Sequence, residues 1–509
     1  MANDLLKGLM IILQWQNIVA VVFGAFIGTA VGAIPGLSSS VALAILLPIA
    51  YILPAETTII FMVSIWVAAT NGGSITAILL NTPGTGPASA TALDGYPLSL
   101  EGRSGEALAA AVLASMVGGI IGSLAFMFVA PPLAMLSLQF GAAEYVGLAF
   151  FGITFLGVLG GDDVYRGLTS GIIGLFIGTI GLFDGVFRYT GGFIYLYDGL
   201  NLIWVIIGLF VIPQVLLLCT KSGVLVEKAK LTTYSILKVF MIIIKMKFLA
   251  IYFALIGVVV GIIPGAGATL AAWIAYSEAK SRLYKPSDER KFGEGRIEGV
   301  IAPEIANNAT VGGGLIPTLT LGIPGTGTAA VLLGGLIIAG LKPGYDLFIE
   351  SGPQVYAIIL SSFFAVFAFT IICFMFIPYF VKITTVSVSI LLAVIFVFGT
   401  FAAYSGMLNF FGAHICVVIG VIAYMLKNRG FSLPAILLGF ILSPITEKNL
   451  DRLVLSANAR GISLFRFIIA RPIAIILILL AGGLIIWRAI MTYKEKNRSN
   501  FPIEEYNAD

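Results

Sequence analysis

The amino-acid sequence predicts an all-α protein that crosses a membrane many times and consists of two related halves. Hydrophobic residues make up 59% of its 509 positions, and charged residues make up 11%. Its apolar runs are long, and two kinds of Pro-Gly break recur in the second half. Soluble proteins carry about 25% charged residues. A soluble chain could not bury so much apolar surface, so we expect a bilayer as its solvent.

The apolar runs favour helices over a β-barrel. Only these two structures satisfy all their backbone hydrogen bonds inside hydrocarbon. Barrel strands alternate polar and apolar residues over about ten positions, whereas 203–219, 357–376 and 468–487 do not alternate. At about 20 residues per crossing, we expect roughly twelve transmembrane helices. Residues 20–33 continue as a Gly-rich apolar segment, so we expect no cleaved leader.

Two basic segments, 221–247 and 280–296, each contain six Lys or Arg residues. The excess of positive charge predicts that both are cytoplasmic. Only 32 residues, 248–279 (279 − 248 + 1), lie between them. Two legs of 16 residues are too short for two full crossings. The sequence therefore predicts a re-entrant hairpin or a very short helical pair, with its turn near 264–267.

An internal repeat divides the chain. Gly72-Gly73 precedes Pro83-Gly84-Thr85-Gly86, and Gly313-Gly314 precedes Pro324-Gly325-Thr326-Gly327 at the same spacing, since 324 − 83 and 313 − 72 both equal 241. An Ile-Pro-Gly string lies upstream in each half, at Pro35 and Pro264, with an offset of 264 − 35 = 229. The charged segment 280–296 accounts for the difference of 12.

The repeat predicts the domain organisation. We expect a first half at 1–220 with breaks at 34–40 and 81–86, a cytoplasmic basic linker at 221–247, a second half at 248–492 with breaks at 263–269 and 322–327, and a polar, disordered tail at 493–509.

These four breaks predict a transport site. Proline removes a backbone donor, and glycine permits left-handed or extended backbone, so together they end a helix. The next helix then presents free N–H groups that suit a carboxylate, while freed carbonyls suit Na⁺. Paired interrupted helices at corresponding positions of two halves are typical of a transporter's binding site. The alternative is that these are ordinary kinks between helices.

Short uncharged side chains surround the breaks and could bind a carboxylate or an alkali cation without burying a fixed charge. Back-bonding within a helix or a contact between helices is the alternative role for each of them. The substrate-binding candidates are Ser38, Ser39, Asn81, Thr82, Pro83, Gly84, Thr85, Gly86, Pro324, Gly325, Thr326 and Gly327. The cation-coupling candidates are Asn307, Asn308, Glu304, Gly265 and Thr269.

Two acidic residues have competing interpretations. Glu304 is either a first-turn acid favoured by the helix dipole or a site for a cation or proton. Asp94 is more consistent with fixing a loop turn than with contacting a substrate.

No catalytic or nucleotide-binding motif accompanies the breaks. The sequence lacks His-Glu-x-x-His, Gly-x-Ser-x-Gly and the Gly-Lys-Ser/Thr of a phosphate loop. We therefore expect neither an enzyme nor a nucleic-acid binder, and no catalytic residue, bound metal or cofactor beyond a coupling ion. The alternatives are a receptor-independent carrier of another small solute and, less favoured, a membrane enzyme acting on a lipid-linked substrate.

At these motifs the chain resembles the large membrane subunit of tripartite tricarboxylate transporters, the TctA type. The resemblance covers nearly the whole chain before the tail. Ala339 and Tyr345 stand where the family pattern has a His and a Pro, which leaves the role of that loop open. The matching strings are 71–85, 91–98, 187–191, 303–308, 321–326 and 340–344.

The resemblance implies a set of partners and an architecture. A periplasmic solute-binding protein would deliver a di- or tricarboxylate, and a small four-helix membrane subunit would complete the transporter. Uptake across a bacterial inner membrane would be coupled to Na⁺ or H⁺ without ATP. The implied fold resembles elevator-type transporters with two inverted repeats, and the complex could form a homo-oligomer.

Overall fold

The computed structural model describes residues 2–34, 37–159, 164–220, 236–263, 265, 267–285, 288, 290–383, 388–405 and 410–499. The chain divides into two compact units. Unit 1 contains Met1–Gln139 and Thr190–Met425, and unit 2 contains Phe140–Tyr189 and Leu426–Asp509. Each unit takes chain from both sides of the basic linker, so the units are not the two halves expected from the repeat.

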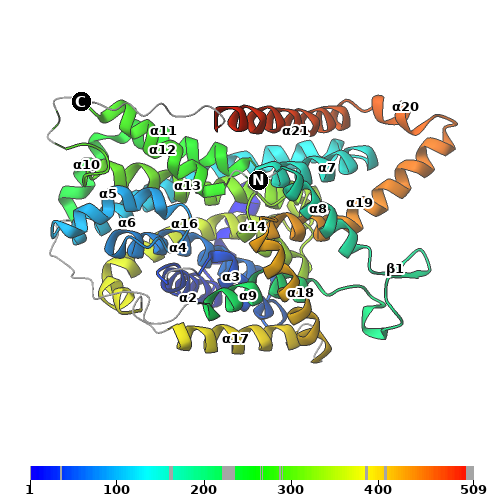
Figure 1. Cartoon of the computed structure of the whole chain (residues 1–509), viewed down its shortest axis with the longest axis horizontal. Helices are drawn as coiled ribbons and strands as arrows, with labels where there is room; N and C mark the ends of the chain where they lie inside the picture. Colours follow the sequence, from blue (N-terminus) through cyan, green and yellow to red (C-terminus); the bar gives the residue numbers. More distant parts are fainter. Residues whose placement is uncertain are drawn as a thin grey trace. The chain divides into compact units, whose positions relative to one another are not determined.

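Unit 1 is a set of helices joined mostly by short connections (Figure 1). Short 3₁₀ turns lie at Leu47–Tyr51, Ser137–Gln139 and Ile194–Leu196. The helices are α1 (Ala2–Ile12), α2 (Trp15–Gly32), α3 (Ser39–Leu46), α4 (Ala55–Leu80), α5 (Ala88–Leu100), α6 (Ser104–Leu136), α9 (Leu202–Cys219), α10 (Ile236–Lys245), α11 (Lys247–Ile262), α12 (Gly267–Leu283), α13 (Glu298–Leu321), α14 (Gly327–Ile338), α15 (Tyr345–Glu350), α16 (Gly352–Ile383), α17 (Val388–Ser405) and α18 (Phe410–Asn428).

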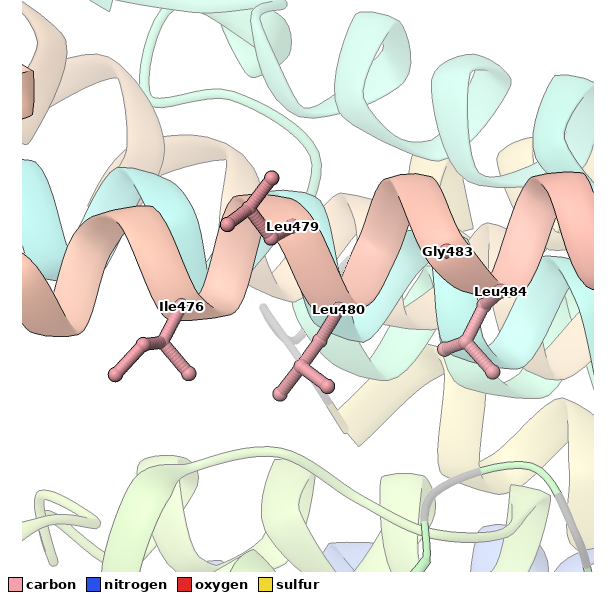
Figure 2. Close-up of a pocket in the computed structure, with 5 residues that line it drawn as sticks. All are labelled: Ile476, Leu479, Leu480, Gly483 and Leu484. Atoms are coloured by element: carbon pink, nitrogen blue, oxygen red, sulfur yellow. The ribbon is translucent and has the colours of Figure 1, made fainter.

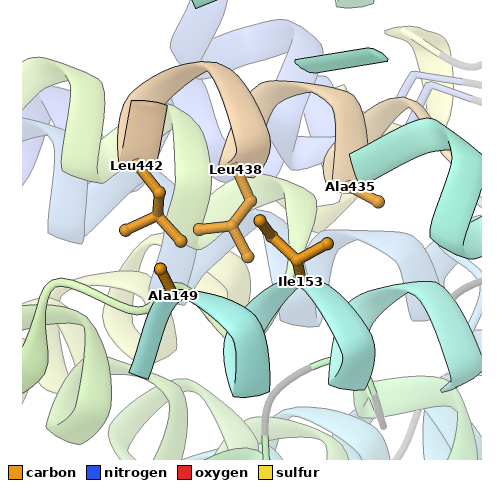
Figure 3. Close-up of a cluster of buried hydrophobic side chains, with 5 residues drawn as sticks. All are labelled: Ala149, Ile153, Ala435, Leu438 and Leu442. Atoms are coloured by element: carbon orange, nitrogen blue, oxygen red, sulfur yellow. The ribbon is translucent and has the colours of Figure 1, made fainter. Parts of the chain in front are cut away.

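Unit 2 brings together segments from distant parts of the chain. Its elements are α7 (Ala142–Leu159), α8 (Val164–Gly178), the antiparallel strands β1 (Gly181–Phe183) and β2 (Val186–Arg188), α19 (Leu433–Ala459), α20 (Leu464–Ile469) and α21 (Pro472–Ser499). Figure 3 shows Ala149 and Ile153 of α7 facing Ala435, Leu438 and Leu442 of α19. Helical spacing places each set on one face, and their burial holds α7 against α19.

The helices are those of a membrane protein. By length and composition, six described helices are apolar enough to cross a bilayer, or seven if α10 and α11 count as one bent span. Six further apolar helices or helical segments are shorter. The structure confirms an all-helical membrane protein, and its two short strands are a minor addition. The count of roughly twelve crossings stays a prediction, because several expected crossings are short helices.

Glycines allow two pairs of helices in unit 1 to pack closely. A Cβ added to Gly28 of α2 would collide with the Ile65 carbonyl of α4, and one added to Gly257 of α11 would collide with the Ala306 carbonyl of α13. These positions differ by the repeat offsets, since 257 − 28 = 229 and 306 − 65 = 241. Small residues let membrane helices approach to backbone contact.

The same close approach occurs at two further positions of each pair. Gly32 contacts Ala69 and Gly261 contacts Thr310, while Gly72 contacts Thr29 and Gly313 contacts Val258. Corresponding residues of α2 and α11 again differ by 229, and corresponding residues of α4 and α13 again differ by 241. The α2–α4 pair and the α11–α13 pair therefore pack in the same register.

Two segments that were expected to be a linker and a disordered tail contain helix. The basic linker was expected to extend to Lys247, but Ile236–Lys245 forms α10, whose Val239 and Ile243 are buried. Apolar residues between Lys238 and Lys245 give this segment a face that can pack. The tail was expected to be disordered from 493, but α21 continues to Ser499. Residues 221–235 and 500–509 lie outside the described residues.

Candidate functional site

All four predicted breaks separate two helices of unit 1. They lie between α2 and α3, α4 and α5, α11 and α12, and α13 and α14. The α11–α12 pair flanks the turn that the charge pattern predicted near 264–267. Pro35, Gly36, Pro264 and Ala266 lie outside the described residues. Each break is followed by a new helix N-terminus, as the Pro-Gly chemistry predicts.

The helices before the two Pro-Gly-Thr-Gly strings end alike. The helix α4 ends at Asn81, which has a left-handed φ of 50°, and α13 ends at Gly322 with a φ of 69°. The next amides, of Thr82 and Ile323, donate to the carbonyls of Thr76 and Pro317. The C-cap positions again differ by 322 − 81 = 241. Left-handed C-caps of this kind turn the chain sharply out of the helix.

The first string folds back onto α4. The Gly84 amide donates to the Gly73 carbonyl over 3.2 Å, so it is not among the free donors that the expected site offers. A Cβ on Gly84 would collide with the Gly32 carbonyl of α2. Gly84 therefore serves close packing between the first two breaks. Asn81 and Thr82 are exposed beside it.

The second string begins α14 with a side-chain cap. Thr326 accepts a hydrogen bond from the Ala329 amide at 3.1 Å. The Gly325 carbonyl, one residue earlier, accepts from the Gly265 amide at 2.7 Å. Pro324 and Gly325 are buried, while Thr326 and Gly327 are partly exposed. This bond joins both breaks of the second half.

Breaks of different halves also meet. The Ser40 hydroxyl, at the start of α3, lies 3.0 Å from the Thr328 hydroxyl of α14. A Cβ on Gly86 would lie 2.7 Å from Thr269 Oγ1, so the first Pro-Gly-Thr-Gly string contacts α12. The two pairs match closely under the repeat: 269 − 40 = 229 equals one offset, and 328 − 86 = 242 exceeds the other, 241, by one residue. We call the meeting of the four breaks the break junction.

The other predicted serines lie beside the break junction. Ser38 caps α3 by accepting from the Val41 amide at 3.4 Å, and Ser39 is buried in the first turn of that helix. Thr269 is exposed in the first turn of α12. Ser38, Ser39 and Thr269 therefore lie at helix N-termini, where backbone N–H groups favour anions.

Three of the predicted residues carry buried oxygens that have no hydrogen-bond partner among the described residues. They are Thr85 Oγ1, Asn307 Oδ1 and Asn308 Oδ1. Thr85 lies against Gly73 of α4, and the Asn307 side-chain amide donates to the Thr70 carbonyl one turn earlier, at 3.4 Å. Buried acceptors are normally satisfied, so these oxygens can take a further donor, a water or a cation.

Glu304 lies at the centre of a separate buried cluster. Its Oε1 is 2.5 Å from the hydroxyls of Ser74 and Thr91, and its Oε2 is 2.9 Å from the Ser115 hydroxyl. Glu304 lies beyond the first turn of α13, which begins at Glu298, so its interpretation as a first-turn acid was wrong. At about 1.5 Å per residue, Glu304 is about 27 Å along α13 from Gly322.

The partners of Glu304 were not among the residues predicted from the sequence. Ser74, Thr91 and Ser115 come from α4, α5 and α6. The available signal was their occurrence as hydroxyl residues in apolar, Ala- and Gly-rich segments. That signal is weak, because such residues usually bond to their own helix.

Asp94 fixes a loop turn, as predicted, but that turn belongs to the distant charged loop and not to its own segment. Its Oδ1 accepts from the amides of Gly293, Gly295 and Arg296 at 2.8–3.0 Å, and its Oδ2 accepts from the Tyr276 phenol at 2.8 Å. In the same loop, the Lys285 amide and then the Arg296 guanidinium lower the pKa of Asp288 below its ordinary value. The loop is therefore tied down at both ends.

One cavity on α21 does not resemble a carboxylate site. The shallow pocket in Figure 2 is lined by Ile476, Leu479, Leu480, Gly483 and Leu484, all on α21. No polar side chain lines it, as expected of a surface that faces lipid. Among the described residues, no cluster of three or more His, Cys, Asp or Glu could hold a metal ion.

The broken helices of unit 1 match a feature of membrane transporters, many of which have paired interrupted helices at their binding sites. A family model described as "Tripartite tricarboxylate transporter TctA family" matches residues 18–438. The chain belongs to this family, and it is a membrane subunit of a tricarboxylate transporter that works with partner subunits.

Two relatives come from Agrobacterium vitis. One is described as an "Uncharacterized 52.8 kDa protein in TAR-I ttuC' 3'region"; it is 32% identical over 494 residues, covering 96% of both chains. The other, an "Uncharacterized protein in TAR-II ttuC' 3'region", is 35% identical over 196 residues, covering 38% of this chain and 80% of the relative. No solved structure matches the chain.

Proposed function

We propose that this protein is the large transmembrane subunit of a receptor-dependent secondary transporter that imports di- and tricarboxylates by Na⁺ or H⁺ symport. The observation that carries the proposal is the break junction, where Ser40 meets Thr328 and Gly86 meets Thr269. The substrate would bind there.

Charge and chemistry support a carboxylate as the ligand. Four helices, α3, α5, α12 and α14, begin at the junction, and their N-termini carry partial positive charge. The two Pro-Gly-Thr-Gly strings contain no Lys or Arg. Amides and hydroxyls must therefore bind the anion, and the unpartnered Thr85 Oγ1 is one hydroxyl able to donate to it. A substrate with two or three carboxylate groups could place each group at a different helix N-terminus.

Two inverted repeats with elevator-type movement complete the proposal. The matched glycine contacts of the α2–α4 and α11–α13 pairs support a repeat. The bonds Ser74–Glu304 and Asn307–Thr70 support inversion, because residue numbers rise along α4 as they fall along α13. The helices therefore cross antiparallel.

The partners follow from the family. We propose that a periplasmic solute-binding protein delivers the carboxylate and that a small four-helix subunit binds this chain in a bacterial inner membrane. A homo-oligomer of the complex is a further expectation. The receptor would set much of the choice of substrate, since the junction offers few distinguishing side chains.

Uptake into proteoliposomes tests this function. The chain is reconstituted with the small subunit, and uptake of radiolabelled citrate is measured with and without purified receptor. We expect uptake only with the receptor and an imposed Na⁺ or proton gradient. Equal uptake without receptor would instead identify a receptor-independent carrier.

Gly84→Ala tests the role of the first Pro-Gly-Thr-Gly string. The added Cβ would collide with the Gly32 carbonyl, so the string must shift. We expect uptake to be abolished while the protein still inserts. Gly482→Ala is the matched control, because its Cβ would meet no atom within 4 Å. Wild-type uptake by Gly84→Ala would contradict the assignment.

A further inference from the structure

Glu304 is a completely buried carboxyl group whose side-chain partners are all hydroxyls. The side chains of Ser74, Thr91 and Ser115 surround it on α4, α5 and α6. Among the described residues, no Lys or Arg forms an ion pair with it. A permanently charged carboxylate without a countercharge would cost several kcal/mol in this environment. The Glu304 carboxylate must therefore be stabilised by hydrogen bonds or neutralised by a proton.

Hydroxyl partners suit both protonation states of a carboxyl group. A hydroxyl can donate to a carboxylate, and it can turn to accept from a carboxylic acid. The backbone N–H groups around Asp94 can only donate, so they suit a carboxylate alone. The hydrogen-bond partners of Asp94 on α5 and Glu304 on α13 therefore differ: Asp94 accepts mainly from backbone amides, and Glu304 is bonded by side-chain hydroxyls.

The orientation of Ser115 is fixed by two side-chain amides. Asn71 and Asn308 each donate an N–H to Ser115 Oγ, at 3.0 and 2.7 Å. A hydroxyl oxygen has two lone pairs, so its own hydrogen must point to Glu304 Oε2. The side-chain amide of Asn308 also donates to the backbone carbonyl of Glu304, and Asn71 Oδ1 accepts from the Cys373 thiol. These contacts hold both amides in the required orientation.

We infer that Glu304 is a proton-exchange site, at which Oε1 binds and releases a proton while Ser115 remains a donor to Oε2. On uptake, a hydronium ion gives its proton to Oε1 and becomes water, and release reverses this step. One of the two hydroxyls, Ser74 or Thr91, turns from donor to acceptor of this proton and then donates to a carbonyl of its own helix, while the other continues to donate to Oε1. The inference rests on the proposed function, in which this proton would be the coupling ion.

The contacts around Oε1 favour a proton over a sodium ion. Both hydroxyl oxygens are already 2.5 Å from Oε1. A cation placed between them and Oε1 would force these groups apart, whereas a proton adds no volume. Oε1 therefore accommodates a proton in the geometry that it already has.

Few other titratable groups face Glu304. On α5, Asp94 follows Thr91 by one turn and bonds to Tyr276 of α12. On α16, Cys373 is connected to the cluster through Asn71. The described contacts from α4 and α6 come from Ser and Asn side chains, and α11 presents Gly257 to the adjacent turn of α13. Asp94 has three amide donors and one phenol around it, whereas Glu304 is the acid whose side-chain partners are all hydroxyls.

Infrared spectroscopy of the purified full-length protein tests the inference directly. The spectrum of Glu304→Gln is subtracted from that of the wild type at each pH at which both stay folded. We expect a carboxylic C=O band at low pH that gives way to carboxylate bands at high pH. A Glu304 signal that stays entirely acid or entirely carboxylate would overturn the inference.

Ser115→Ala tests which oxygen holds the proton. Oε2 is the carbonyl oxygen of the protonated acid, so losing the Ser115 hydrogen bond should raise its C=O stretching frequency. Ser74→Ala should change the pH midpoint and leave that frequency nearly unchanged. The opposite pattern would overturn the assignment of the proton to Oε1. If Glu304→Gln does not fold, the band shift in Ser115→Ala identifies Glu304 instead.

Transport then tests the coupling. In proteoliposomes with all three components, an imposed pH gradient should drive citrate accumulation by the wild type and by Glu350→Gln, an exposed control. Glu304→Gln should lose it, and wild-type accumulation by this variant would overturn the coupling role. If the wild type took up no citrate under any gradient, the proposed function would fail while the infrared result would stand.

Discussion

Asp94 joins two segments that lie about 200 residues apart in the chain. Its carboxylate on α5 collects three amides of the 293–296 turn, at sequence separations of 199–202. A Cβ on Gly299 would collide with this carboxylate, so α13 also packs directly against it. The charged insert of the second half is thereby held on a helix of the first.

Replacing Asp94 should destabilise the protein. Asp94→Ala removes a fully buried acceptor from three amides, of which that of Gly295 is in a buried hydrogen bond and the other two are in part-buried ones, and such losses cost about 1–3 kcal/mol. Asp94→Asn keeps one oxygen for the three amides and should cost less. Denaturant unfolding in detergent measures the free energy, and equal stability of Asp94→Ala and the wild type would refute the anchor.

The sequence predicted the roles of Asp94 and Glu304 unequally. Asp94 stands in an Asp-Gly-x-Pro string, whose turn chemistry predicted a role in fixing a loop turn. The string lies inside α5, however, and the turn that Asp94 holds is at 293–296. The surroundings of Glu304 come from three helices separated from it by 189 to 230 positions. No local pattern connects those hydroxyls, and only the fold brings them together.

Helix packing in unit 1 depends on glycine at specific turns. Gly28 and Gly257 place α2 and α11 against carbonyl groups of α4 and α13. The breaks that follow these helices are positioned by this packing, because α2 and α11 end only a few residues later. The packing of α2 on α4 and of α11 on α13 therefore helps to set the positions of the breaks at the junction.

Gly28→Ala and Gly257→Ala should each destabilise the protein to a similar degree. Each methyl group would meet a backbone carbonyl that cannot turn away, and such overpacking costs about 1–3 kcal/mol. Gly482→Ala should be neutral or stabilising by about 0.5–1 kcal/mol, because alanine favours helix. Thermal unfolding in detergent compares the three variants. A Gly257→Ala variant as stable as Gly482→Ala would show that the close contact is unimportant.

The sequence predicted the positions of elements better than their extent. Pro and Gly act through local backbone chemistry, so all four helix breaks could be placed within a few residues. The helix α10 was missed because six basic residues in 221–247 suggested a loop, while its buried face depends on tertiary packing. The end of α21 was missed for a similar reason, since charge alone does not end a helix.

At the scale of the whole molecule, the two halves of the sequence and the two compact units are different divisions. Unit 2 combines α7 and α8 with α19–α21, which lie on opposite sides of the repeat boundary. Sequence periodicity reveals the repeat but not how segments from each half associate. The break junction and the Glu304 cluster both lie within unit 1.

Cysteine cross-linking at the break junction tests the central claim most directly. Ser40→Cys and Thr328→Cys are introduced together, at hydroxyls that lie 3.0 Å apart, with each single variant as a control. We expect the pair to cross-link, citrate with its receptor to slow the reaction, and the cross-linked transporter to lose uptake until it is reduced. Unchanged citrate uptake by fully cross-linked protein would contradict a transport site at this junction.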